Sequence, residues 1–128
     1  THTSNTYMAT RDVPDFCVME ANEPLLLPSY AIGIDAAFSI VFNLLPREVR
    51  EMYDLVFEKN DLAAARKLNE KLYPIFHLME AEPYPGPVKA ALDAIGLPGG
   101  IVRKPLVQPS EGLRTAMREE LRKLGYNV

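Results

Sequence analysis

Residues 84–106, YPGPVKAALDAIGLPGGIVRKPL, form the most informative stretch of this sequence. Prolines precede a short alanine-rich segment, and a basic Arg-Lys-Pro turn follows it. The segment predicts a helix over residues 87–95, because Pro87 is tolerated at the first helical position, where its missing N–H would have had no partner. Gly96 directly follows the last apolar position, Ile95, and is typical of a left-handed helix end.

The composition places the chain among ordinary globular proteins. It has 128 residues, of which 48% are hydrophobic and 24% charged. The net charge of −3 argues against a nucleic-acid-binding surface, which requires a basic excess. The single cysteine, Cys17, excludes an internal disulfide framework and a cysteine-rich metal site. No apolar run approaches the roughly 18 residues of a membrane span, and no signal peptide is recognised, so we expect a cytoplasmic protein.

The first 45 residues predict a parallel strand-helix-strand unit. Residues 15–19 (DFCVM) and 36–41 (AAFSIV) are short, continuously apolar runs, which is typical of buried strands. Residues 23–32 between them predict a short helix that ends at Gly33 and is irregular at its start because of Pro28. The polar residues 1–12 predict a loop.

From Pro46 onward the pattern is helical. We expect a helix over residues 46–59 and a long second helix capped by Asn60 or Asp61. A final helix is expected from about Ser110 to residue 124. Two strands do not make a stable open sheet alone, so the two predicted strands require further strands to cover them.

Several segments, in order, resemble the family of dihydrodipicolinate synthase and N-acetylneuraminate lyase. Residues 20–28 (EANEPLLLP) are similar to the family's segment after barrel strand seven, and residues 33–45 (GIDAAFSIVFNLL) to strand eight. The motif KNDLAAARKLNEKLYPIF is similar to the first helix of the family's C-terminal extension. Residues 84–106 resemble its Pro-Val-Lys-Ala-Ala-Leu signature. The resemblance covers essentially the whole chain.

The resemblance implies an α/β fold that is mainly helical. Residues 1–59 would supply the last two parallel strands of a (β/α)8 TIM barrel, and residues 60–128 a helical extension. A complete barrel of this type needs about 250 residues, roughly twice the length of this chain. The resemblance therefore implies only the C-terminal portion of such an enzyme.

By the same resemblance, the complete enzyme is a lyase that uses no cofactor and joins pyruvate to an aldehyde-type molecule, or cleaves the product, through a Schiff base on a lysine. The family's Lys-x-Thr-Ser motif places Thr1 at that lysine. A threonine hydroxyl cannot form an imine with a ketone, so we expect no catalytic residue and an inactive isolated chain. The expected partners are a second copy or the missing barrel half, with no nucleic acid or membrane.

Three explanations of the short chain remain open at this point. It is a fragment, one half of a split enzyme, or a degenerate homologue that serves as a non-catalytic helical interaction or oligomerisation module. Unpaired strand edges and apolar strand faces, which favour self-association or a partner, motivate the last of these.

The resemblance implies four substrate-binding positions. Glu23 aligns with an acidic residue at the rim of the barrel, although a carboxylate favoured by a helix N-terminus is an equal interpretation. Ala21 replaces the usual glycine beside it. Ser39 and the backbone of Phe38 lie on strand eight, where packing is the alternative role. Asn43 is expected to cap the next helix or to tie a loop.

The remaining candidates have ordinary interpretations. We expect Lys89 on a solvated helix face. Arg103 and Lys104 suit an ion pair or solubility better than anion binding. His77 falls within an apolar helical stripe and predicts a partly buried histidine. Cys17 is expected to be a small apolar residue in a strand. The sequence predicts no metal site, which would need at least three such ligands together.

Overall fold

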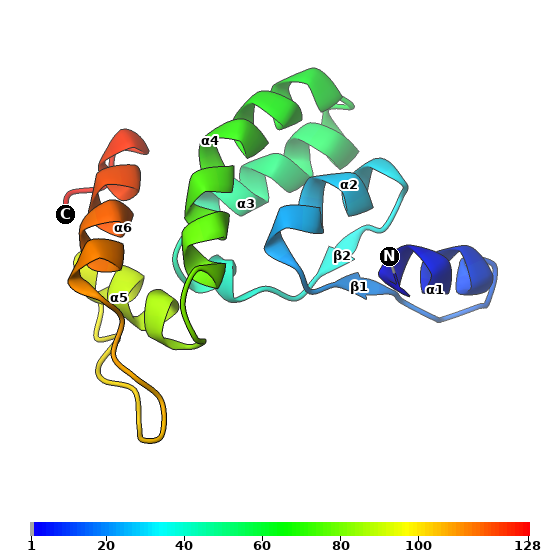
Figure 1. Cartoon of the computed structure of the whole chain (residues 1–128). Helices are drawn as coiled ribbons and strands as arrows, with labels where there is room; N and C mark the ends of the chain where they lie inside the picture. The colour runs from blue at the N-terminus through cyan, green and yellow to red at the C-terminus, as the bar shows by residue number, and fades with distance from the viewer. Residues whose placement is uncertain (1) are drawn as a thin grey trace. The chain divides into compact units, whose positions relative to one another are not determined.

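The computed structural model describes residues 2–128, and the chain divides into two compact units (Figure 1). The first extends to Asn69 and the second begins at Glu70. The division falls within the long helix α4 (Leu62–Glu80). Within residues 2–128, no helix combines the length and the apolar character needed to cross a membrane.

The first unit contains the predicted parallel strand-helix-strand arrangement. Its strands β1 and β2 pair in parallel, with Met19 opposite Ala36 and Glu20 opposite Ala37. The elements in order are α1 (His2–Thr10), β1 (Met19–Glu20), η1 (Glu23–Leu25), α2 (Leu26–Ala31), β2 (Ala36–Ala37), η2 (Ile40–Asn43), α3 (Pro46–Tyr53) and the π-helical turn η3 (Asp54–Glu58).

Both strands are shorter than the sequence predicts. β1 begins only at Met19, and Phe16 and Cys17 before it are exposed, so the prediction of a buried strand over residues 15–19 and of an enclosed Cys17 is wrong. The sheet in the described residues has two strands, so each strand has one neighbour and little apolar surface to pack against. After Ala37, the Ser39 hydroxyl accepts a hydrogen bond from the amide of Val41, and the chain turns into η2 instead of continuing as a strand.

The predicted N-terminal loop is a helix, α1. Thr6 Oγ1 donates to the carbonyl oxygen of His2 at 3.0 Å, and Thr10 Oγ1 donates to that of Thr6 at 2.7 Å. None of the residues of α1 is buried. The loop prediction is therefore wrong: residues 2–10 are polar but helical, and two threonine hydroxyls donate to the backbone of the same helix.

The helix predicted over residues 46–59 is present, but its last turn is π-helical. Val49 and Met52 are buried, three residues apart on one face of the helix. In η3, Leu55 is buried while Val56 and Phe57 remain half-buried. Extra residues in a π-turn change which side chains face the core.

The second unit is helical and follows the predicted end signals. Helix α5 covers Gly86–Ala94 and α6 covers Glu111–Lys123. The Ser110 hydroxyl accepts from the amide of Leu113, which makes Ser110 the N-cap of α6. Its core is made of apolar residues from α4, α5, α6 and one loop: Leu72, Ile75, Phe76, Met79, Val88, Ala90, Ala91, Val102, Leu113, Met117 and Leu121.

Two side chains, His77 and Lys89, differ from expectation. His77 is exposed, because the buried stripe of α4 follows the helical spacing of Leu72, Ile75, Phe76 and Met79 and position 77 falls outside it. Lys89 is half-buried and donates from Nζ to the carbonyl oxygen of Gly99 at 2.6 Å, instead of lying on a solvated face. Arg103 and Lys104 are exposed, and no carboxylate within residues 2–128 forms an ion pair with either of them, so of their two expected roles only the ion pair is not observed.

Candidate functional site

Two polar side chains meet where the parallel strands end. Glu23 begins η1, shortly after β1, and Ser39 lies two residues after β2. Ser39 Oγ donates to Glu23 Oε1 at 2.7 Å. In α/β folds, ligands bind outside the carboxyl ends of parallel strands. The structure therefore brings together two of the four predicted substrate-binding residues, at the end of the sheet where such sites occur.

The hydrogen bonds of Ser39 show that Ser39 and Glu23 have different roles. Its hydroxyl donates to Glu23 and accepts from the amide of Val41 at 3.1 Å, and the residue is buried. Ser39 therefore orients Glu23 and caps η2. Glu23 is half-buried, and its Oε2 has no hydrogen bond to any residue in the range 2–128. This oxygen is the one that a hydroxyl or ammonium group of a ligand can reach.

The other two predicted residues lie beside this pair. The amide of Phe38 donates to the carbonyl oxygen of Glu20 at 2.8 Å, while its ring is 71% exposed. Ala21 is exposed, and its amide donates to Glu20 Oε1 at 3.0 Å. Phe38 therefore takes part through its backbone in the sheet, and its ring is free to contact other groups. Thr1, the predicted position of the imine-forming lysine, lies outside the described residues.

A buried carboxylate, Glu20, supports the site and was missed by the sequence interpretation. It is 2% exposed. Oε1 accepts from the amides of Ala21 and Asn22, both at 3.0 Å, and Oε2 accepts from Ser29 Oγ at 2.5 Å. These bonds fix the chain between β1 and Glu23. The sequence signal was a glutamate directly after an apolar run, but its partner Ser29 comes from α2, nine residues later.

Asn43 ties a turn, which was one of its two predicted roles. Its Nδ2 donates to the carbonyl oxygen of Ile40 at 3.2 Å. The N-cap of α3 is instead Leu45, which makes no side-chain capping bond. Among residues 2–128, no three histidine, cysteine, aspartate or glutamate side chains gather closely enough to hold a metal ion.

A parallel βα pair with polar side chains after both strands is typical of an α/β protein that binds its ligand at the carboxyl ends of the strands. The model of the Dihydrodipicolinate synthetase family matches residues 2–124. The chain belongs to this family.

Individual relatives agree with that assignment. The chain is 37% identical over 108 residues to a 4-hydroxy-tetrahydrodipicolinate synthase of Methanocaldococcus jannaschii, covering 84% of this chain and 37% of that one. It is 38% identical over 111 residues to the synthase of that name from Chlorobium phaeobacteroides, covering 87% and 37%. The crystal structure of dihydrodipicolinate synthase from Thermotoga maritima superposes with a TM-score of 0.85 at 28% identity, covering 96% and 41%. The chain thus spans about two-fifths of the length of these proteins.

Proposed function

We propose that the chain is the C-terminal part of a Schiff-base pyruvate aldolase. Residues 1–59 supply the last two strands of its barrel, and residues 60–128 its helical extension. The single observation that carries the proposal is the Glu23–Ser39 pair at the carboxyl ends of two parallel strands. The family match over residues 2–124 supports it. The named activity of the relatives favours synthesis, in which an enamine made from pyruvate attacks an aldehyde.

In this proposal Glu23 forms part of the wall of the substrate pocket. Its unbonded Oε2 accepts a hydrogen bond from the polar arm of the aldehyde substrate, and Ser39 holds the carboxylate in place. Ala21 carries a methyl group beside this position, which narrows the space for the substrate. The Phe38 ring supplies an apolar surface to the same wall. None of these side chains forms or breaks a covalent bond to the substrate.

The imine itself requires a lysine, and the family resemblance places Thr1 at the position of that lysine. We therefore expect the 128-residue chain by itself to form no Schiff base. Borohydride reduction in the presence of pyruvate, followed by mass spectrometry, tests this expectation. The predicted result is an unmodified chain, and a reduced pyruvate adduct on any lysine of this chain would contradict it.

A chimera tests the proposed role directly. Residues 2–128 replace the matching segment of the Methanocaldococcus jannaschii synthase, which keeps its own lysine. We expect pyruvate-dependent condensation, and we expect Glu23→Gln to raise KM for the aldehyde with little change in imine formation. The unaltered relative is the matched control. A folded chimera that forms the imine with pyruvate but has no condensation activity would refute the proposed role.

A second candidate is a non-catalytic interaction module, which could also act as a homo-oligomer. Exposed apolar side chains near the two strands favour it, namely Phe16, Met19 and Phe38. Light scattering coupled to size-exclusion chromatography distinguishes the candidates. A monomer with cooperative unfolding over a wide concentration range would disfavour this module.

A further inference from the structure

A closed circuit of backbone and hydrogen bonds contains the Glu23–Ser39 pair. The backbone runs from Glu20, at the end of β1, to Glu23, whose Oε1 accepts from Ser39 Oγ at 2.7 Å. It returns through Phe38, whose amide donates to the carbonyl oxygen of Glu20 at 2.8 Å. We call residues 20–23 with Phe38 and Ser39 the strand-end circuit. Because the circuit is closed, a displacement of any part of it moves the Glu23 carboxylate.

The Glu20 carboxylate holds the part of the circuit that leads to Glu23. Its Oε1 accepts from the amides of Ala21 and Asn22, both at 3.0 Å. Asn22 is the N-cap of η1, and its side chain makes no capping bond. Ala21 and Asn22 are both exposed, so packing does little to hold them. The carboxylate is therefore the main restraint on the two residues that precede Glu23.

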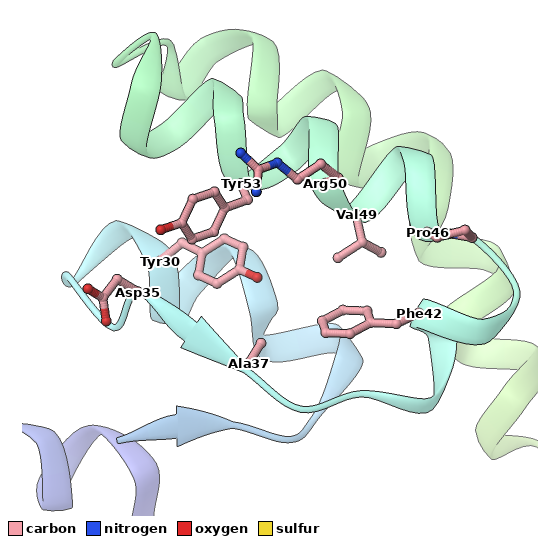
Figure 2. Close-up of a pocket in the computed structure, with 8 residues that line it drawn as sticks. All are labelled: Tyr30, Asp35, Ala37, Phe42, Pro46, Val49, Arg50 and Tyr53. Atoms are coloured by element: carbon pink, nitrogen blue, oxygen red, sulfur yellow. The ribbon is translucent and has the colours of Figure 1, made fainter. Parts of the chain in front are cut away.

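The same carboxylate is anchored to a packed helix. Its Oε2 accepts from Ser29 Oγ of α2 at 2.5 Å, and Glu20 and Ser29 are 2% and 3% exposed. The next residue of α2, Tyr30, packs edge-on against Tyr53 and Phe57, at centroid distances of 5.8 and 5.4 Å. Figure 2 shows the side chains of Tyr30 and Tyr53 meeting between α2 and α3. Ser29 therefore connects the strand-end circuit to a helix that is itself fixed by packing.

The position of Glu23 bears on the stereochemistry of a condensation. Its Oε2 has no hydrogen bond to any residue in the range 2–128 and is the atom proposed to hold the polar arm of the aldehyde. An aldehyde carbonyl is planar, and the face that it presents to the pyruvate enamine depends on where its arm is held. A misplacement of about 1 Å can cost a reaction roughly 100-fold in rate. The contacts that hold Glu23 all lie within residues 20–57, so they do not depend on the strands that complete the barrel.

We propose that Glu20 and Ser29 are positioning residues that select which face of the aldehyde is attacked. They act by holding Glu23 at one place on the rim, and neither of them touches the substrate. This role rests on the proposed function, because it requires a substrate arm bound to Glu23. It also deepens that function, since it assigns the configuration of the new carbinol carbon to a buried hydrogen-bonded pair beneath the site.

Two aldehydes of equal carbon number test this role in the chimera described above. D-Glyceraldehyde carries hydroxyl groups that can donate to Glu23, and propanal carries none. Condensation with pyruvate creates a carbinol carbon in both products, and chiral chromatography resolves its two configurations. With glyceraldehyde, we expect Ser29→Ala to lower the ratio of the two configurations about threefold or more and to raise KM about three- to tenfold. The ratio obtained with propanal should not change.

Three further variants separate positioning from stability. Glu20→Gln keeps an oxygen for the two backbone amides and brings an NH2 group to Ser29, so it should retain most of the selectivity. Ser110→Ala is the matched control, because it removes a capping hydroxyl from α6 in the second unit and should leave the ratio unchanged. If Ser29→Ala does not fold, Glu20→Asp decides, since it keeps the charge but withdraws it from Ser29 by one methylene and should show the same loss of selectivity.

Nuclear magnetic resonance on the 128-residue chain measures the displacement without any reaction. Nuclear Overhauser effects between the Glu23 and Ser39 side chains should weaken in Ser29→Ala and persist in Ser110→Ala. Undiminished effects in Ser29→Ala would overturn the positioning role. So would a chimera in which Ser29→Ala leaves the glyceraldehyde ratio unchanged or alters the propanal ratio equally. An unaltered chimera that forms the imine but condenses neither aldehyde would instead count against the proposed function and the positioning role together.

Discussion

Removal of the Glu20 carboxylate tests how the candidate site is held in place. In Glu20→Ala, the Ser29 hydroxyl loses its acceptor in a buried position, which costs about 1–3 kcal/mol. The amides of Ala21 and Asn22 also lose their acceptor, but both residues are exposed and water can replace it. We therefore expect a total loss of about 2–4 kcal/mol in the free energy of unfolding.

Removing the other partner of this hydrogen bond, Ser29, gives an independent measure of its contribution to the free energy of unfolding. Ser29→Ala leaves the buried carboxylate with two of its three donors, and we expect a loss of about 1–3 kcal/mol. In the double variant neither partner is left unpaired, so its loss should be smaller than the sum by about 1–2 kcal/mol. Glu20→Gln is the conservative control, because its amide oxygen can still accept from the two backbone amides.

Urea unfolding followed by far-ultraviolet circular dichroism measures these differences. Hydrogen exchange at the amides of Ala21 and Asn22 reports the local effect, and both should exchange faster in Glu20→Ala than in Glu20→Gln. A loss below about 0.5 kcal/mol in Glu20→Ala, or strict additivity in the double variant, would refute the reasoning.

Two further predictions concern the second unit. Gly99→Ala should destabilise it by about 3 kcal/mol or more, because a Cβ at this position would lie 2.1 Å from the backbone oxygen of Lys89. Gly112→Ala, on an open face of α6, should instead stabilise the second unit by about 0.5–1 kcal/mol. Thermal unfolding measures the effects of both substitutions. Equal changes in stability for the two variants would contradict the argument. Hydrogen bonds from the Ser110 hydroxyl and amide lower the pKa of Glu82 below its ordinary value of 4.5. The stabilisation from this carboxylate is present above pH 4.5 and is lost as the pH falls through the lowered pKa of Glu82. The urea midpoint of the unaltered chain should therefore fall in acid, and Glu82→Gln should reduce that dependence on pH. The same dependence in both proteins would exclude the effect.

Signals that act within one helical turn were predictable from the sequence. Ser110 caps α6 through the amide of Leu113, and Gly96 and Gly125 take left-handed conformations after α5 and α6. Such features depend on a few neighbouring residues. Strand lengths were not predictable, because β1 and β2 extend only as far as each has a neighbour. The apolar run before Met19 contained no information about whether that neighbour exists.

The candidate site likewise contains residues that the sequence identified and residues that it did not. Glu23 and Ser39 were identified through the family resemblance, and parallel strands bring such positions together at one end of the sheet. Glu20 was not identified as a site residue, since its environment arises from tertiary packing. Ser29 reaches Glu20 from α2, and Tyr30 of the same helix packs against Tyr53 of α3 in a contact that nothing in the sequence predicted. A glutamate or tyrosine in the sequence gives no indication of burial before the helices are placed.

The two faces of the sheet differ in burial, and the difference bears on the proposed barrel. On the face toward α2 and α3, Glu20 is buried and bonded. On the opposite face, Met19 and Phe38 are 49% and 71% exposed. In a closed barrel, this second face is the interior, where large apolar side chains are packed. The exposed face therefore supports a barrel completed by further strands. Such strands would also place the Glu23–Ser39 pair at the mouth of an enclosed site.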